Sequence, residues 1–394
     1  MATYDLIIVG AGVHGASLAF HLAQRGVRPL VLERASVAAG ATGRSSGLVR
    51  MHYALRLEAE LVWHSFPYFR HWNELVGFGD CGFVRTGFLR VVGPQYEAAL
   101  RANVRMLQQV GIPTWLLTAD DVRRLAPYLT TDDFRVAAYE PESGYADPPA
   151  TAQGFLQAAR ARGALLRTGA PVQALLTTPD GSRMRGVRLV DGSTHQAEVV
   201  VLAAGAWAPR LAATVGLDLP LTTWSHDVMF VQRPAGVRWF PADLTVIDDA
   251  NEMYFRPDQG NLTLVGLEVG NPIGEDPDSP TDYPHPGFVE RAIEHVVRRV
   301  PLLAEGALHS AHRGYDGLSP DQRAIIGPAG PEGLWLNVGH SGTGFKIAPA
   351  VGRALTEWLL DGQPRLVDLR AFGLARFAQG RPLQPEHPYG PLWH

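Results

Sequence analysis

A glycine-rich turn near the start of the chain lies between a short apolar stretch and a helical pattern. Residues 4–9 read Tyr-Asp-Leu-Ile-Ile-Val, and Gly-Ala-Gly-Val-His-Gly follows at 10–15. Apolar residues then recur up to Ala23 at the i, i+3, i+4 spacing of a buried helix face. A second apolar stretch at 30–32 ends at Glu33. The segment therefore predicts a strand, a helix and a second strand, with a turn of the form GxGxxG between the first two.

Each glycine of this turn has a separate physical role in holding a pyrophosphate. Gly10 permits the tight turn, Gly12 lets a pyrophosphate approach the backbone, and Gly15 lets the helix pack closely against the strand. The helix start offers free N–H groups and a positive dipole end to the phosphates. Glu33 lies 18 residues beyond Gly15, where an acid accepts hydrogen bonds from a ribose diol. A GxGxxG alone is a weak signal, but between a strand and a helix, with this acid following, it predicts a dinucleotide site.

The composition is that of an ordinary globular protein. The chain has 394 residues, enough for two or three domains, with 46% hydrophobic and 19% charged residues. The net charge of −4 gives no electrostatic reason to expect nucleic acid or an acidic membrane as a partner. No apolar run approaches the roughly 18 residues of a membrane span, and the N-terminal residues do not read as a signal peptide. The single cysteine, Cys81, fits a reducing compartment. We therefore expect a cytoplasmic protein without a membrane span.

Strand–glycine–helix units alternate along the chain with segments that contain strand patterns only. Residues 199–207 and 334–360 repeat the arrangement of the N-terminus, whereas apolar runs between 221 and 267 succeed one another without a helical pattern. The latter pattern predicts an antiparallel sheet. We predict a mixed α/β fold in which a substrate domain is inserted twice into a dinucleotide-binding domain. The predicted boundaries are 1–80, 145–220 and 311–380 for the dinucleotide-binding domain, 81–144 and 221–310 for the substrate domain, and 381–394 for an irregular C-terminal tail.

Several motifs in this order resemble those of the D-amino-acid oxidase superfamily of flavoproteins. Within it, the branch of sarcosine oxidase, dimethylglycine dehydrogenase and glycine oxidase looks most similar. The motifs are Gly10–Gly15 with Glu33 and Arg34, Thr42–Gly47, Gly144–Pro148, Val199–Trp207, Leu318–Asp321 and Gly342–Lys346. They span nearly the whole chain and are more specific together than any one alone. The resemblance implies FAD rather than NAD, a Rossmann-like FAD-binding domain, and an inserted substrate domain on an antiparallel sheet.

The resemblance also implies which segments hold the FAD. The ADP half would lie on the first strand–helix–strand unit, the loop at 41–48 beside the pyrophosphate and flavin, and the C-terminal glycine loop at the isoalloxazine. The helix that begins near Ile347 would point its positive end at the flavin. The predicted cofactor-binding residues are Gly10, Gly12, Val13, His14, Gly15, Glu33, Arg34, Ala41, Thr42, Arg44, Ser45, Ser46, Gly47, Leu48, Val172, Ala204, Gly205, Trp207, Gly339, His340, Gly342, Thr343, Gly344, Phe345 and Lys346.

Three departures from the family pattern bear on the chemistry. Some relatives bind flavin covalently through a cysteine, and the matching position here is Gly314. Others use a histidine, for which the chain has no convincing match, so we expect non-covalent FAD, and we expect no metal. A lysine of the inserted sheet activates oxygen in monomeric sarcosine oxidase, whereas the segment 261–266 has none. Thr343 and Asp316 stand where that enzyme has a histidine and a tyrosine. The electron acceptor therefore stays open between O2 and another acceptor, and the substrate need not be sarcosine.

The family reaction oxidises a C–N bond by hydride transfer to flavin N5 and gives an imine, which hydrolyses. In the sarcosine oxidase branch an arginine and a lysine hold the substrate carboxylate, and these match Arg50 and Lys346. The alternative is that Arg50 pairs with a structural acid and that Lys346 is solvated. Tyr254 matches a tyrosine that faces the pocket, although a core tyrosine would fit the pattern equally well. His226 is a weaker candidate, because a histidine in such a place is more often a hydrogen-bonded scaffold.

These observations predict an FAD-dependent oxidase or dehydrogenase that acts on a small carboxylated amine, such as a sarcosine-like amine or an amino acid. Two other functions stay open. The same fold would suit a 2-hydroxy acid or glycerol phosphate dehydrogenase, and the chain could be the flavin subunit of a larger complex. Assembly into a homo-oligomer also stays open.

Overall fold

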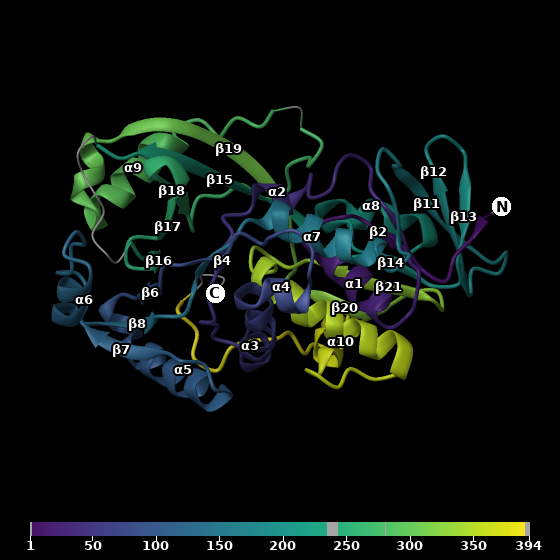
Figure 1. Cartoon of the computed structure of the whole chain (residues 1–394), viewed down its shortest axis with the longest axis horizontal. Helices are drawn as coiled ribbons and strands as arrows, with labels where there is room; N and C mark the ends of the chain where they lie inside the picture. Colours follow the sequence, from purple (N-terminus) through teal and green to yellow (C-terminus); the bar gives the residue numbers. More distant parts are fainter. Residues whose placement is uncertain (1, 235–242, 280, 391–394) are drawn as a thin grey trace.

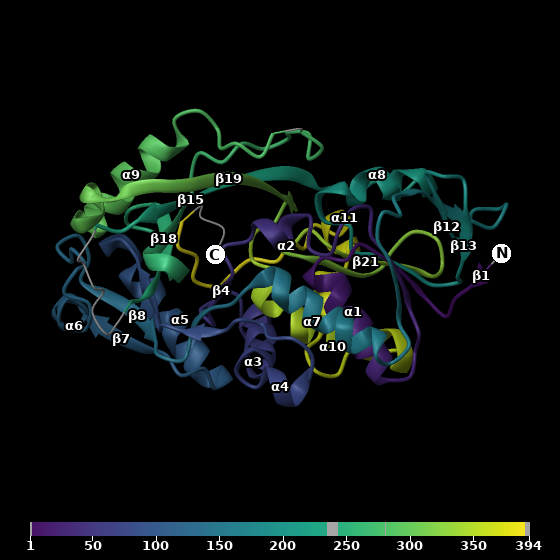
Figure 2. The same cartoon turned by 45° about the horizontal axis from the view of Figure 1, so that its top comes forward.

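The computed structural model describes residues 2–234, 243–279 and 281–390, and it has an elongated shape (Figure 1). A large sheet with helix α9 lies at one end, and strands β11 to β13 lie with the N-terminus at the other (Figure 2). Helices α1, α7 and α10 lie together between these ends in both views. Residues 1, 235–242, 280 and 391–394, which fall within the predicted domain and tail ranges, lie outside the described residues.

The sheet that carries the glycine turn is mostly parallel. Its strands, in order, are β10 (Leu165–Arg167), β3 (Leu30–Leu32), β2 (Ile7–Val9), β14 (Val200–Leu202), β21 (Leu334–Val338) and β20 (Ile325–Pro328). Only the last pairing, between β20 and β21, is antiparallel. The helices α1 (Val13–Gln24), α7 (Pro148–Arg160) and α10 (Ala348–Asp361) pack on it and on one another. The predicted strand–helix–strand unit and the mixed α/β class are confirmed.

Two glycines of the turn are required by the close approach of neighbouring backbone. Gly10 has a φ of +111°, and a Cβ atom there would lie 2.4 Å from the carbonyl oxygen of Ala203. A Cβ atom at Gly15 would lie 2.0 Å from the carbonyl oxygen of Gly10. Helix α1 can therefore begin directly at the strand end only because both positions lack a side chain.

A second sheet of eight strands forms the other large layer. Its order is β19 (Ala307–Leu318), β15 (Thr222–Gln232), β18 (Leu262–Leu267), β17 (Met253–Asp258), β16 (Thr245–Asp248), β6 (Phe88–Val91), β8 (Val136–Glu140) and β7 (Trp115–Thr118). The antiparallel pairing predicted for 221–267 is confirmed, but β16 pairs with β6 in parallel. The helix α9 (Phe288–Arg299) packs on this sheet through Phe288, Ala292 and Val296.

Two smaller sheets and several helices complete the described fold. One sheet has the order β1 (Ala2–Thr3), β13 (Thr194–Gln196), β12 (Met184–Leu189) and β11 (Val172–Thr177), and the other β4 (Leu48–Val49), β9 (Gly144–Tyr145) and β5 (Val84–Arg85). The remaining α-helices are α2 (Ala41–Arg44), α3 (Arg56–Arg70), α4 (Trp72–Leu75), α5 (Glu97–Val110), α6 (Ala119–Leu125), α8 (Ala208–Ala212) and α11 (Ala375–Ala378).

The strand β19 crosses the predicted boundary between residues 310 and 311. It pairs with β15 along its whole length, so residues 311–318 continue the large sheet. The predicted division into a cofactor domain and a substrate domain therefore stays a prediction, with this boundary falling inside a strand.

The C-terminal segment 381–390 contains no helix or strand and packs against its own chain. The backbone N–H of Leu383 donates to Asp321 Oδ2 at 2.9 Å, and Asn103 Nδ2 donates to the His387 carbonyl at 2.8 Å. Tyr389 is only 1% exposed. In Figures 1 and 2 this yellow segment returns from the helices to the neighbourhood of β4.

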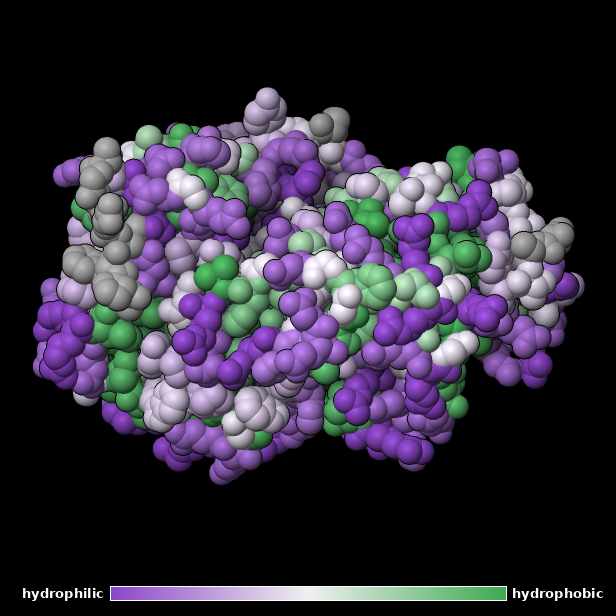
Figure 3. Space-filling model, viewed as in Figure 1, coloured by the Kyte–Doolittle hydropathy of each residue, from purple (hydrophilic) through white to green (hydrophobic). Residues whose placement is uncertain are grey.

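The surface of the molecule is mixed in character. On the face in Figure 3, hydrophobic residues form small separate groups among hydrophilic residues. Among the described residues, none of the helices combines the length and the apolar character that crossing a bilayer requires.

Candidate cofactor and substrate site

A cavity of about 470 Å³ runs from the glycine turn to the large sheet. It is lined by the C-terminal ends of β2, β3 and β14, by the loop after β21, and by residues of β15, β16, β17 and β19. The predicted residues that line it are Gly10, Gly12, Val13, His14, Glu33, Arg34, Ala41, Thr42, Arg44, Ser45, Ser46, Leu48, Arg50, Val172, Ala204, Gly205, Trp207, His226, Tyr254, His340, Gly342, Gly344, Phe345 and Lys346.

Four predicted cofactor-binding residues do not line the cavity but support its walls. Gly15 packs on the turn itself, and a Cβ atom at Gly47 would lie 2.3 Å from the carbonyl oxygen of Ala146. Gly339 packs against Leu221 in the same way. The Thr343 hydroxyl donates to the carbonyl of His340 at 2.9 Å, which fixes the shape of the C-terminal loop.

The glycine-turn end of the cavity is built largely from backbone. Glu33 accepts hydrogen bonds from the backbone N–H groups of Ala11 and Ala35, each at 2.9 Å. The backbone N–H of Val13 donates to Thr42 Oγ1 at 3.0 Å, so the loop at 41–48 is tied to the start of α1. The carboxylate, the turn and the helix start thus face one space, as dinucleotide binding requires.

A cluster of charges that the sequence did not reveal lies over this end. The Arg34 guanidinium lies 4.0 Å from the ring of Trp207. Asp278, in the loop between β18 and α9, accepts from Arg34 at 2.6 Å, from Arg210 at 2.5 Å and from Trp207 Nε1 at 2.8 Å. Asp278 is remote in sequence from its three partners and lies in a loop without periodicity, so no local pattern could have found it.

Most of the other cavity residues that were not predicted are neighbours, in the sequence or in an adjacent strand, of residues that were. They are Val9, Leu32, Ala35, Ala39, Gly40, Ala170, Pro171, Gln173, Ala203, Arg210, Leu211, Ile247, Tyr315 and Asn337. Gly314 and Asp316, which the sequence singled out as departures from the family pattern, also line the cavity.

Two histidines, the half-buried His14 and the buried His340, join the glycine turn to the C-terminal loop. The rings of His14 and His340 stack with their centroids 3.4 Å apart and an angle of 11°. His14 Nε2 lies 3.1 Å from the Gly344 carbonyl, and His340 Nε2 lies 3.0 Å from Asn337 Oδ1. Burial lowers the pKa of His14 to about 3 and holds the pKa of His340 well below its usual value. Both rings are therefore neutral at physiological pH, which lets them stack without charge repulsion.

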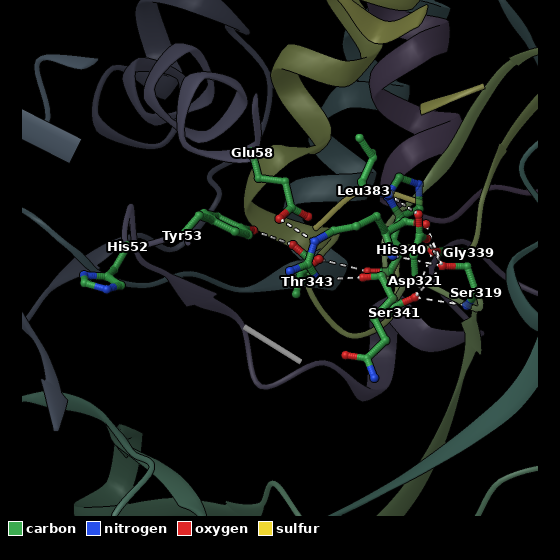
Figure 4. Close-up of polar contacts among 12 residues, drawn as sticks. His52, Tyr53, Glu58, Ser319, Asp321, Gly339, His340, Ser341, Thr343 and Leu383 are labelled. Carbon is green, nitrogen blue, oxygen red and sulfur yellow. Dashed lines mark hydrogen bonds and ion pairs between the residues drawn. The ribbon is translucent and has the colours of Figure 1, made fainter. Parts of the chain in front are cut away.

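The C-terminal loop is held by a set of polar contacts (Figure 4). The Tyr53 hydroxyl donates to the Thr343 carbonyl at 2.8 Å, and Ser341 Oγ donates to the Gly339 carbonyl at 3.0 Å. Ser341 Oγ in turn accepts from the backbone N–H of Ser319 at 3.2 Å. The loop that carries Lys346 is thus anchored at several points before any ligand binds.

Arg50 and Lys346 lie at the far end of the cavity as two buried cations. Their exposed fractions are 1% and 5%. The Arg50 guanidinium carbon lies 4.6 Å from the ring of Tyr53, and Lys346 Nζ lies 5.4 Å from the same ring. Within the described ranges, neither cation forms an ion pair with a carboxylate. The charge of Glu58 acts on both cations from a distance, and Glu58 itself pairs with Arg323 Nε at 3.1 Å. The alternative arrangement, with Arg50 paired to an acid and Lys346 solvated, is therefore not what the structure shows.

Burial lowers the pKa values of both cations. Desolvation, reinforced by the charge of Arg50, holds the pKa of Lys346 well below its usual value. Desolvation also lowers the pKa of Arg50, although a guanidinium remains charged. A buried charge without a partner is costly, and an anion in the cavity would relieve that cost. The site is therefore suited to a carboxylate.

Lys346 is also the only lysine in the sequence, since all other basic residues among the 35 lysines and arginines are arginines. An ammonium can lose its proton when buried, whereas a guanidinium cannot. A single lysine in an arginine-rich chain is a signal that sequence reasoning could have used and did not.

Three further side chains complete the substrate end. Tyr254 of β17 lies over Gly266 of β18, where a Cβ atom would come within 2.2 Å of its ring. His226 of β15 lies with its ring centroid 4.1 Å from that of Trp224, and burial lowers the pKa of His226 to about 4. Asp316 accepts from the backbone N–H of Gly342 at 2.6 Å, and burial raises the pKa of its carboxyl. All three line the cavity.

The fold and this cavity define a dinucleotide-dependent oxidoreductase. A family model described as "FAD dependent oxidoreductase" (DAO) matches residues 5–358, and the chain belongs to this family, whose cofactor is FAD. The cavity residues fit FAD, because they join a glycine turn and helix start to a space that continues to two cations without an ion-pair partner among the described residues.

Several known proteins are similar to the chain. It is 27% identical over 390 residues to mitochondrial sarcosine dehydrogenase of Homo sapiens, and the alignment covers 95% of the chain and 42% of that protein. It is 29% identical over 381 residues to mitochondrial dimethylglycine dehydrogenase of Rattus norvegicus, covering 91% of the chain and 43% of that protein. The crystal structure of glycine oxidase from Geobacillus kaustophilus superposes with a TM-score of 0.81 at 26% identity, covering 95% of this chain and 99% of that one. The chain thus spans less than half the length of the two dehydrogenases.

Proposed function

We propose that the protein oxidises the C–N bond of a small carboxylated amine with FAD as the electron acceptor. The observation that carries this proposal is the pair of buried cations, Arg50 and Lys346, which share the substrate end of the cavity and form no ion pair with a carboxylate in the described part of the chain. The similarity to proteins named for sarcosine, dimethylglycine and glycine supports the same substrate class.

The residues of the chain account for binding and orientation. Arg50 and Lys346 hold the carboxylate by charge-assisted hydrogen bonds, which fixes the direction of the carbon that is oxidised. Their positive charge lowers the pKa of the substrate ammonium, so the amine is presented with the free electron pair that C–N oxidation needs. Tyr254 and the neutral His226 form a wall that adds no charge at this point. The bound FAD supplies the acceptor for two electrons, and water then hydrolyses the imine product to a carbonyl compound and a smaller amine.

We propose that the FAD is bound non-covalently. At Gly314, where some of the covalent relatives carry a cysteine, a Cβ atom would lie 2.4 Å from Cβ of Arg44. A side chain at this position would displace Arg44, which pairs with Asp282 at 2.8 Å. Denaturation should therefore release all flavin into the supernatant, and a protein mass increased by one FAD would contradict the proposal.

The acceptor that reoxidises the flavin is proposed to be other than O2. The strand β18 contains no lysine, and Lys346 is engaged with the substrate carboxylate in this proposal. Reduced protein should return slowly to its yellow form in air-saturated buffer and quickly with an artificial acceptor, as stopped-flow absorbance can measure.

The experiment that tests the function is anaerobic mixing of the yellow protein with a substrate panel. The panel contains sarcosine, dimethylglycine, proline, glycine, D- and L-amino acids and 2-hydroxy acids, with amines that lack a carboxylate as matched controls. We expect bleaching of the flavin by one class of carboxylated amine and none by the controls. Bleaching by a 2-hydroxy acid alone would overturn the proposal in favour of a hydroxy acid dehydrogenase, whose substrate also carries a carboxylate for the two cations.

The cellular location and the assembly state are further proposals. We propose a cytoplasmic protein that works without a partner subunit. Cell fractionation tests the first statement. Light scattering during gel filtration, with and without cell extract, tests the second and measures whether the chain forms a homo-oligomer.

A further inference from the structure

We propose that Tyr389, in the C-terminal segment 381–390, is a positioning residue that orients Arg50 for carboxylate binding through His52. The inference rests on the proposed role of Arg50 as a substrate-binding cation. It adds a residue that lies beyond the part of the chain matched by the family model, which ends at 358.

The contact path from Tyr389 to the cavity is short and direct. The Tyr389 hydroxyl oxygen lies 2.7 Å from His52 Nε2, and the two groups share a hydrogen bond. Their rings are stacked with centroids 5.9 Å apart and an angle of 30°. The carbonyl of the same His52 accepts a hydrogen bond from Arg50 Nη1. Arg50 itself lines the cavity, so a single residue separates Tyr389 from a substrate-binding group.

Tyr389 is held firmly from its other side. The Arg90 guanidinium lies 4.8 Å from the centre of the Tyr389 ring, an arrangement favourable for a cation–π contact. Arg90 is fully buried and is fixed by Asp249, which accepts from Arg90 Nε at 3.1 Å and from Nη2 at 2.7 Å. The backbone of the segment is anchored two residues earlier by the hydrogen bond from Asn103 to His387. The tyrosine hydroxyl therefore has a defined position from which to hold His52.

Arg50 depends on this support because no acid orients it. Among the described residues, its guanidinium contacts only the His52 carbonyl as a hydrogen-bond acceptor, together with the face of the Tyr53 ring. His52 is equally dependent, since its Nδ1 atom has no partner in the described part of the chain. Burial and the charges of Arg90 and Arg50 hold the pKa of His52 well below its usual value, which keeps the ring neutral. Without the tyrosine hydroxyl, the His52 side chain would lose its fixed position, and the carbonyl that directs Arg50 would move with it.

The test uses the FAD-loaded protein and benzoate, a carboxylate without an amine. In Tyr389→Phe, which keeps the ring over Arg90, we expect the Kd of benzoate, read from the flavin absorbance change, to rise about fivefold. The KM of a carboxylated substrate should rise by the same factor, with kcat nearly unchanged. Flavin content and melting temperature should match the wild type.

A matched control removes the same atom from a neighbouring tyrosine. The Tyr96 hydroxyl lies against Gly390 of the same segment, where a Cβ atom would come within 2.3 Å of it. Tyr96→Phe should leave the Kd of benzoate unchanged. If Tyr96→Phe lost as much benzoate affinity as Tyr389→Phe, any weakening of the C-terminal segment would lower the affinity, and the inference would be overturned.

A double-mutant cycle separates this inference from the proposed function. In an Arg50→Ala background, Tyr389→Phe should cause no further loss of benzoate affinity, because the group that it positions is absent. If Tyr389→Phe still lowers benzoate affinity about fivefold in that background, the inference alone is overturned. The same holds if Tyr389→Phe binds benzoate as tightly as the wild type while Arg50→Ala binds it more weakly. Unchanged benzoate affinity in Arg50→Ala would overturn the proposed function and this inference together. If Tyr389→Phe does not retain FAD, His52→Leu serves in its place, with the same fivefold expectation and the same overturning result.

Discussion

The two ends of the cavity are built in different ways. At the glycine-turn end the central groups are the backbone of one contiguous stretch, residues 10–33, in which Glu33 itself bonds to backbone N–H groups, and neighbouring segments close around it. At the substrate end they are side chains, brought together from β4, β15, β17, β19 and the loop at 339–346. The first end can therefore be recognised from local sequence, whereas the second is assembled only by the complete tertiary fold.

The largest effect that we expect is a loss of FAD affinity, caused by a change at the glycine-turn end alone. In Gly15→Ala the new methyl group would lie 2.0 Å from the Gly10 carbonyl oxygen, so the turn must open. We expect FAD affinity to fall by about 100-fold or more, measured by titrating apoprotein with FAD. Gly26→Ala is the control for backbone strain away from the turn, because Gly26 has a φ of +82° but a methyl group there meets nothing within 4 Å. Equal flavin content in the two variants would contradict the required close approach at Gly15.

The next largest effect that we expect is a rise in the KM of the amine substrate, caused by changes at the substrate end alone. Arg50→Ala and Lys346→Ala each remove one charge-assisted contact, and we expect KM for a carboxylated amine to rise about 10- to 100-fold. The Kd of FAD should change little, because the glycine turn is untouched. Binding of benzamide, the uncharged analogue of benzoate, is the control and is read from the flavin absorbance change. A loss of the same size with benzamide as with benzoate would mean that the residues do not recognise the carboxylate.

A pH dependence should distinguish the lysine from the arginine. The carboxylate binds best while Lys346 is protonated, and burial lowers the pKa of that ammonium. Benzoate affinity should therefore be constant below the pKa of Lys346 in the free protein and fall about tenfold per pH unit above it. In Lys346→Arg the profile should be flat, since a guanidinium keeps its proton. A profile in Lys346→Arg that matches the wild type would assign the titration to another group.

The single lysine allows the pKa of Lys346 to be measured directly. Protein labelled with ¹³C-lysine gives one side-chain signal, because Lys346 is the only lysine in the sequence. Its chemical shift should titrate well below pH 10.5, the ordinary value, and benzoate should move the midpoint upward. A midpoint at the ordinary value with no response to benzoate would place the amine in solvent.

The smallest effect should come from the charges over the glycine-turn end. Asp278 is 42% exposed, and its ion pairs with Arg34 and Arg210 are correspondingly screened by solvent. Asp278→Ala should speed FAD dissociation up to about fivefold at low salt, and less at high salt. Glu332→Ala removes another exposed ion pair, that with Arg183, far from the cavity, and should not change the rate. If Asp278→Ala changed the rate of FAD dissociation equally at low and high salt, the contact with Trp207, and not the charge of Asp278, would determine the rate.

The strand–helix–strand unit at the glycine-turn end could be predicted from the sequence because it is encoded by spacing. The glycines at 10, 12 and 15 mark the turn within a few residues, and the strand pattern at 221–267 marked the second sheet. Arg50, Lys346, Tyr254 and His226 could be proposed only from the resemblance, and the structure brings all four to one cavity. The sequence showed neither Asp278 nor Tyr389, since each lies in a segment without periodicity whose partners are remote. The parallel pairing of β16 with β6 was also hidden, because it joins strands more than 150 residues apart.

The stacked pair of His14 and His340 has a consequence for the order of events during synthesis. The turn that begins the chain is closed from the opposite side by residues 340–346, so the wall of the cavity that carries Lys346 does not exist until those residues have left the ribosome. The N-terminal strand–helix–strand unit must wait through the synthesis of most of the chain before the enclosed cavity forms, and pairings so distant form slowly. The enclosed cavity can therefore take up FAD only in a protein that is nearly complete.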